Sequence, residues 1–133
     1  MSEIGEIPQD LKYSKEHEWV RTQGAELEVG ITAFAANALG DVVFVELPAI
    51  GSTLSEGKPF GVVESVKSVS DLFAPVNGRV TAINATLNSS PELVNESPYA
   101  GGWMIRLQPD KPDDTNRLLN AVDYQAMLEA SAH

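Results

Sequence analysis

Cysteine is absent from the 133-residue chain, which excludes disulfides, thiolate metal sites and cysteine nucleophiles. Basic residues are scarce, because nine lysines and arginines stand against 19 acidic residues and leave a formal net charge of −10. Binding to nucleic acid or to an anionic membrane needs clustered basic residues, so this balance argues against both. The acidic surface instead favours partners with basic docking rims.

Long apolar runs are also missing. No stretch approaches the roughly 20 residues of a membrane-spanning helix, and no membrane association is expected. The first residues, "MSEIGEIPQDLKYS", have neither the basic nor the apolar region of a secretory signal or transit peptide. We therefore predict a cytoplasmic protein, although a mature mitochondrial form would look similar. The length predicts one domain over residues 1–133, with a β core at about 11–109 and a C-terminal helical segment at 113–130.

Short strands separated by turns dominate the pattern. Alternating apolar residues between 16 and 32 predict two strands joined at Gln23–Gly24, and β-branched runs predict further strands at 41–48, 77–84 and 103–109. Helices are predicted at 32–40 and 120–130, with Thr32 and Asn120 as N-caps, and a loop at 89–102. The similar stretches "AIGSTL" and "AINATL" flank the segment between them, which suggests a small sandwich of two similar β units.

The segment "ESVKSVSD", residues 64–71, is nearly palindromic and lies between the predicted hairpin arms 60–66 and 68–76. We expect Lys67 and Ser68 to form its tip, most simply as a type I turn. Val66 would then lie opposite Val69, as an exposed apolar collar around the lysine.

In the same register Glu64 would face Asp71, and opposed like charges cost stability. A lysine at a hairpin tip often only blocks edge pairing. The scarcity of lysine, the collar and the opposed acids favour a specific role here. An ε-amine on a flexible stem, held out by a rigid hairpin, suits an amide-linked prosthetic arm.

These residues resemble the H proteins of the glycine cleavage system, and the resemblance extends from about Leu11 to Leu128. The stretches that carry it are "KYSKEHEWV", "GITAFAANALGDVVFVELP", "GVVESVKSVSDLFAPVNGRV" and, above all, "LVNESPYAGGW". The resemblance implies a mostly β fold, a hybrid barrel-sandwich of two antiparallel sheets with a short helix and a C-terminal helix. It also implies a monomeric carrier with no active site of its own.

The resemblance further implies that lipoate is linked to Lys67 as lipoyllysine. The implied partners are the pyridoxal-phosphate-dependent glycine decarboxylase (P protein), the tetrahydrofolate-dependent aminomethyltransferase (T protein), the dihydrolipoyl dehydrogenase (L protein) and a lipoylating enzyme. The carrier takes an aminomethyl group from the first to the second and is reoxidised by the third. Around the arm the hairpin supplies Glu64, Val66, Ser68, Val69 and Asp71.

Family members shelter the loaded arm in a cleft, where Glu18 and Asp71 are candidate contacts for its amine. Some members place a histidine just before "LGD", where this chain has Ala38, so a histidine role in the cleft is absent or supplied otherwise. His17 is expected to be structural. With His133 at the chain end, no metal site is expected.

Other carriers fit less well. Acyltransferase lipoyl domains typically show "DKA" at the tip and belong to longer chains with linkers, and biotinyl carriers show a lysine between two methionines. Two readings stay open: an H-like relay that donates lipoate to other enzymes, and a binding module without an arm.

Overall fold

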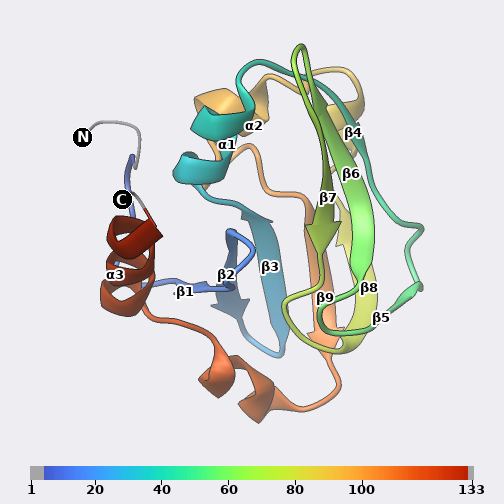
Figure 1. The fold of residues 1–133 in the computed structure, drawn as a ribbon. Helices are drawn as coiled ribbons and strands as arrows, with labels where there is room; N and C mark the ends of the chain where they lie inside the picture. The colour runs from blue at the N-terminus through green and yellow to red at the C-terminus, as the bar shows by residue number, and fades with distance from the viewer. Residues whose placement is uncertain (1–4, 132–133) are drawn as a thin grey trace.

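The computed structural model describes residues 5–131, shown in Figure 1. Within them nine short strands form two sheets in which every pair of neighbours is antiparallel. The larger sheet has the order β1-β2-β3-β9-β8-β5, with β1 at Lys12–Tyr13, β2 at Glu18–Gln23, β3 at Glu26–Ile31, β5 at Thr53–Leu54, β8 at Gly78–Ile83 and β9 at Ile105–Pro109. The smaller has the order β4-β6-β7, with β4 at Val42–Glu46, β6 at Pro59–Ser65 and β7 at Val69–Phe73.

Three α-helices and two 3₁₀ turns complete the described fold: α1 at Ala33–Leu39, η1 at Ala85–Asn88, α2 at Leu93–Glu96, η2 at Pro112–Arg117 and α3 at Ala121–Ser131. Helices α1 and α2 pack together near the β6–β7 tip, whereas α3 lies beside β1 (Figure 1). No helix among residues 5–131 is long and apolar enough to cross a membrane.

Two apolar clusters hold these elements together. The main one fills the space between the sheets and includes Val29, Val63, Leu72 and Leu107, each at most 1% exposed. A smaller cluster joins β1 and β2 to α3 through Leu11, Tyr13, Trp19, Ala121, Tyr124 and Leu128. Burial of these side chains from both sheets is the main favourable contribution to folding.

The expected fold class is confirmed, as are the caps of both predicted helices. Thr32 accepts a hydrogen bond from the Ala35 amide, and Asn120 accepts one from the Asp123 amide. Gly40 ends α1 with a φ of 83°, a conformation that glycine adopts without strain.

Two details differ from the expectations. The predicted loop at 89–102 contains the one-turn helix α2, which is too short to show a helical period in the sequence. The two copies of the six-residue repeat do not form equivalent elements, because the first leads into β5 and the second runs from the end of β8 into the turn η1. Strands β5 and β8 belong to the same sheet. Their similarity therefore does not mark one copy in each sheet.

Candidate functional site

The β6–β7 hairpin carries Lys67 at its tip, but its strand register differs by two residues from the expected one, so the centre of the turn moves by one residue. Glu64 pairs with Val69, and the Ser65 amide donates to the Ser68 carbonyl at 2.8 Å. The two central residues are therefore Val66 and Lys67, not Lys67 and Ser68. Asp71 pairs with Val62, so the predicted opposition of Glu64 and Asp71 is wrong. The predicted opposition of Val66 and Val69 is wrong for the same reason, because Val69 pairs with Glu64 and Val66 lies in the turn.

The tip is stabilised by Ser65. Its Oγ accepts a hydrogen bond from the Lys67 amide at 3.3 Å and lies 3.3 Å from the Ser68 carbonyl. Neither Val66 nor Lys67 has a positive φ, which excludes the turns that require glycine or asparagine there. A serine side chain thus takes over part of the turn's hydrogen bonding.

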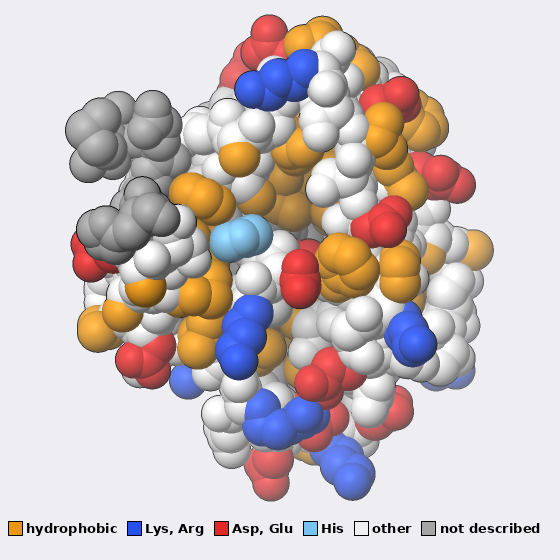
Figure 2. Space-filling model, in the orientation of Figure 1, with side chains coloured by type: hydrophobic (Ala, Val, Ile, Leu, Met, Phe, Trp, Pro, Cys, Tyr) orange, Lys and Arg blue, Asp and Glu red, His pale blue; other side chains and the backbone are white. Residues whose placement is uncertain are grey.

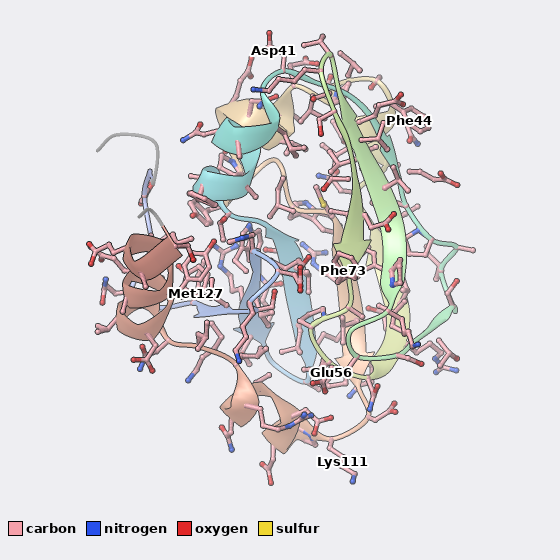
Figure 3. The ribbon with its side chains drawn as sticks, viewed as in Figure 1. Asp41, Phe44, Glu56, Phe73, Lys111 and Met127 are labelled. Carbon is pink, nitrogen blue, oxygen red and sulfur yellow. The ribbon has the colours of Figure 1, made fainter. Side chains whose placement is uncertain are left out.

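The tip also rests on the loop between α1 and β4. The Val66 amide donates to the Asp41 carbonyl at 3.1 Å, and Asp41 lies beside the hairpin end in Figure 3. The Lys67 stem passes over Gly40, where an added Cβ would lie 3.3 Å from Lys67 Cε. Val66 and Val69 are 72% and 65% exposed, so the collar around the lysine is open to solvent.

A cavity of about 320 Å³ lies beneath the hairpin, between it and α1. Helix α1 supplies one wall, β6 and β7 supply the opposite wall, and residues just before and within β2 close the base. Figure 2 shows hydrophobic side chains in this hollow and acidic ones at its edge, and the lining combines apolar with polar and acidic residues. The lining residues are Glu16, His17, Glu18, Ile31, Phe34, Ala35, Ala38, Leu39, Val63, Ser68, Ser70, Asp71 and Leu72.

Glu18 is a buried carboxylic acid at the base of this cleft, only 1% exposed. Its Oε1 accepts a hydrogen bond from the Ser14 hydroxyl, and its Oε2 accepts one from the Phe73 amide at 3.1 Å. Burial raises the pKa of Glu18 to about 7, and these two hydrogen bonds only partly oppose that rise. Glu18 also lines a second cavity of about 300 Å³ on the other side of the Ser14 turn.

His17 lines the same cleft and is fixed by side chains from two other elements. Its Nδ1 lies 2.9 Å from Tyr124 Oη of α3, which in turn lies 2.8 Å from Thr32 Oγ1. Its backbone φ is 75°, the one positive value at a non-glycine residue between 5 and 131. Such a conformation persists only where the surroundings hold it.

The hydrogen bonds of this chain assign the proton on His17. Within the described residues the buried Thr32 hydroxyl has no acceptor other than Tyr124 Oη, so Tyr124 donates to His17 Nδ1. The imidazole is then neutral, with its proton on Nε2. Burial lowers the pKa of His17, in agreement with a neutral ring.

The cleft brings together some of the predicted site residues and leaves out others. Glu18, Ser68 and Asp71 line it. Lys67, Glu64, Val66 and Val69 do not, because they lie on the outer face of the hairpin or at its end, and Lys67 stands next to the lining residue Ser68. The sequence reasoning missed His17 as a lining residue, and it also missed the apolar wall that α1 contributes.

Metal binding finds no support in the part of the chain that is described, since no group of three or more His, Asp or Glu side chains there could hold an ion. His133, the second histidine, lies outside the described residues.

Comparison with known proteins gives a consistent result. The Glycine cleavage H-protein family model matches residues 11–131. A glycine cleavage system H protein of Magnetococcus marinus is 58% identical over 123 residues, which cover 92% of this chain and 88% of that one. One from Bacillus cereus is 54% identical over 121 residues, 91% of this chain and 95% of that one. The crystal structure of such a protein from Mycobacterium marinum superposes with a TM-score of 0.85 at 40% identity, covering 92% and 99% of the two chains.

Proposed function

The chain belongs to the glycine cleavage H-protein family, and from this premise we propose that Lys67 is the residue to which lipoate is attached. Membership confirms the resemblance carried by the sequence motifs. It also establishes the general function: the chain is a lipoyl-carrying component of the glycine cleavage system and not itself an enzyme.

The surroundings of Lys67 support this assignment. Its amine stands at the end of a hairpin, exposed to an attaching enzyme, while its stem lies against a glycine that leaves room for it. The adjoining cleft of about 320 Å³ has a mixed lining, and its apolar part, which includes Ile31, Phe34 and Leu39, suits a chain of methylene groups. Lipoate, when bound, supplies a disulfide that is reduced on taking up an aminomethyl group.

We further propose that Glu18 and Asp71 hold the amine of the loaded arm. Both residues line the cleft, Glu18 with a buried side chain at its base and Asp71 at an exposed position of the hairpin. Ionised Glu18 is costly without a partner, because burial raises its pKa, and a cationic amine would compensate that charge. The apolar part of the lining would exclude water from the same region.

The partners follow from the general function as proposals. They are the P, T and L proteins, which load, unload and reoxidise the arm, and a lipoylating enzyme. A monomeric state and a cytoplasmic location are proposed with them. Size-exclusion chromatography with light scattering and fractionation of the native host test these two points.

The Lys67→Arg variant tests the attachment site. Arginine keeps the charge at an exposed position, so the unfolding midpoint is expected to stay within a few degrees of the wild type. Intact mass and peptide mapping after expression in a lipoylating host should show a lipoyl increment on the wild-type peptide that contains Lys67, and none on the variant.

An unmodified wild-type Lys67 in such a host would overturn the proposal. The remaining interpretation would then be a binding module that carries no lipoyl arm. A modified protein that transfers lipoate to other enzymes, but is not loaded from glycine by the P protein, would instead support the relay.

A further inference from the structure

The segment 93–102, which belongs to the stretch that carries the family resemblance most strongly, contributes no side chain to the cleft. None of its residues lines the cavity that adjoins Lys67. Two of its side chains instead reach the ends of α1, the helix that forms one cleft wall. Helix α2, within the segment, packs directly against α1 (Figure 1).

Asn95 holds the C-terminal end of α1. Its Nδ2 donates to the Gly40 carbonyl at 2.8 Å and lies 3.4 Å from the Ala36 carbonyl, while its Oδ1 accepts from the Val42 amide at 2.8 Å. Carbonyl groups at a helix end lack partners within the helix, so this carboxamide satisfies a need that α1 cannot meet itself. Asn95 thus holds Gly40 and Val42, the residues on either side of Asp41.

Tyr99 holds the other end. Its Oη accepts a hydrogen bond from the Ala33 amide at 2.9 Å, one of the unpaired amides of the first helical turn, and donates to the Glu6 carbonyl. A helix of seven residues has little stability of its own, so its position depends on such outside contacts.

The loop fixed by Asn95 is the one on which the hairpin tip rests. The Asp41 carbonyl accepts from the Val66 amide at 3.1 Å, and Gly40 lies under the Lys67 stem. One side chain therefore connects the cleft wall to the residue that we assign as the attachment site.

We propose that Asn95 is a positioning residue that holds α1 in place as a cleft wall and holds the Lys67 tip beside the cleft. This inference rests on the proposed function, because it gives the cleft a purpose only if Lys67 carries the arm. Its carboxamide acts through the Gly40–Val42 loop and touches neither Lys67 nor the cleft.

Amide hydrogen exchange of the protein without its arm tests the structural half. In Asn95→Ala, exchange at the Val66 and Val42 amides should rise about tenfold, the effect of losing one hydrogen bond of ordinary net strength. The Met104 amide, bonded to the Val29 carbonyl at 2.8 Å in the large sheet, serves as the internal reference and should not change. Asn88→Ala, at an exposed position of η1, is the matched control.

Ammonia release from the lipoylated protein after loading with glycine tests the functional half. A sheltered group reacts with water only from the open state, so release from Asn95→Ala should rise by the same factor as Val66 exchange. Unchanged exchange at Val66, an equal rise at Met104, or faster exchange without faster release would each overturn the inference.

Two further measurements keep the test decisive. If Asn95→Ala does not fold, Asn95→Asp is measured in the same way, since it keeps the acceptor for Val42 and loses the donor to Gly40; the same local rise is expected, and its absence overturns the inference. Failure of the proposed function appears separately, as an unmodified Lys67 in the wild type, and leaves the exchange result to be judged on its own.

Discussion

Glu18 illustrates how a single residue takes its chemistry from neighbours that are distant in the chain. Its carboxyl group is bonded by Ser14, four residues earlier, and by the Phe73 amide, 55 residues later. Among the described residues, the hydrogen-bond partners of this carboxyl group include no cation. Its raised pKa means that the folded protein binds a proton there at a pH where the unfolded chain has already released it.

The Glu18→Gln variant should therefore alter how stability depends on pH. Between about pH 4.5 and 7 the folded state holds the Glu18 proton and the unfolded state does not, so wild-type stability falls as pH rises. Glutamine carries no such proton. The stability of the variant relative to the wild type should grow by on the order of 3 kcal/mol from pH 4 to pH 8.

Urea unfolding of both proteins across this range measures the difference. Ser14→Ala provides a companion measurement, because loss of that hydrogen bond should raise the pKa of Glu18 further and move the transition to higher pH. Parallel stability curves for wild type and Glu18→Gln would mean that Glu18 titrates as an ordinary carboxyl group.

Sequence reasoning singled out Lys67 and Glu18 as candidates, but it did not predict the environment of either. Lys67 could be singled out because exposed valines beside a lysine at a hairpin end are not expected if the tip only makes the surface soluble. The burial of Glu18 could not be predicted, since it requires β7 to pass over β2 at Phe73. The cleft position of His17 likewise depends on α3, whose Tyr124 is 107 residues away.

At the scale of the elements, the β6–β7 hairpin shows why a near-palindrome leaves the register open. Folding about Lys67–Ser68 or about Val66–Lys67 keeps Val63 and Leu72 on the same face, so the apolar pattern cannot separate the two. Contacts outside the hairpin decide. At Gly61, opposite Leu72, an added Cβ would lie 2.4 Å from the Glu46 carbonyl of β4, so only glycine permits this approach.

Ser65→Ala tests the hydrogen bonds that secure the observed turn. The substitution removes the acceptor for the Lys67 amide at a residue that is 6% exposed, and it leaves a side chain that fits the same space. We expect a loss of about 1 kcal/mol in the free energy of unfolding, measured by urea denaturation. Ser68→Ala is the control, because the Ser68 hydroxyl makes no hydrogen bond to any of the described residues.

A larger loss for Ser68→Ala than for Ser65→Ala would contradict the observed register, since it would place Ser68 in the bonding position. Equal and negligible losses would show that the backbone bonds Ser65–Ser68 and Val66–Asp41 secure the tip without the serine side chains.

Across the whole molecule, the fold class and most strands followed from the sequence, whereas the division of strands between the sheets did not. Strand β9 lies between β3 and β8 in the large sheet, so it pairs a strand from the first part of the chain with strands from the second part. Such long-range pairing leaves no local pattern in the sequence. The short helix α2 was missed for a related reason, because its place is set by packing against α1 and not by its own period.

The charge of the whole molecule predicts how it meets a partner. Exposed apolar side chains gather near the tip, with Phe44 50% exposed on the outer side of β4 (Figure 3) and Val66 and Val69 beyond it. The exposed acids Asp41 and Asp71 flank them, in a chain whose net charge is −10. Apolar contacts should set how long a complex lasts, and the acidic field should set how fast it forms.

For the lipoylating enzyme we therefore expect the association rate to fall about tenfold between about 50 and 300 mM NaCl, with little change in the dissociation rate. Stopped-flow measurements on the protein without its arm give both rates. Asp71→Asn should lower the association rate at low salt, whereas Glu129→Gln on α3 should not, because α3 lies away from the tip. An association rate that is independent of salt would mean that the partner recognises the hairpin by shape alone, and that the acidic surface has no part in the encounter.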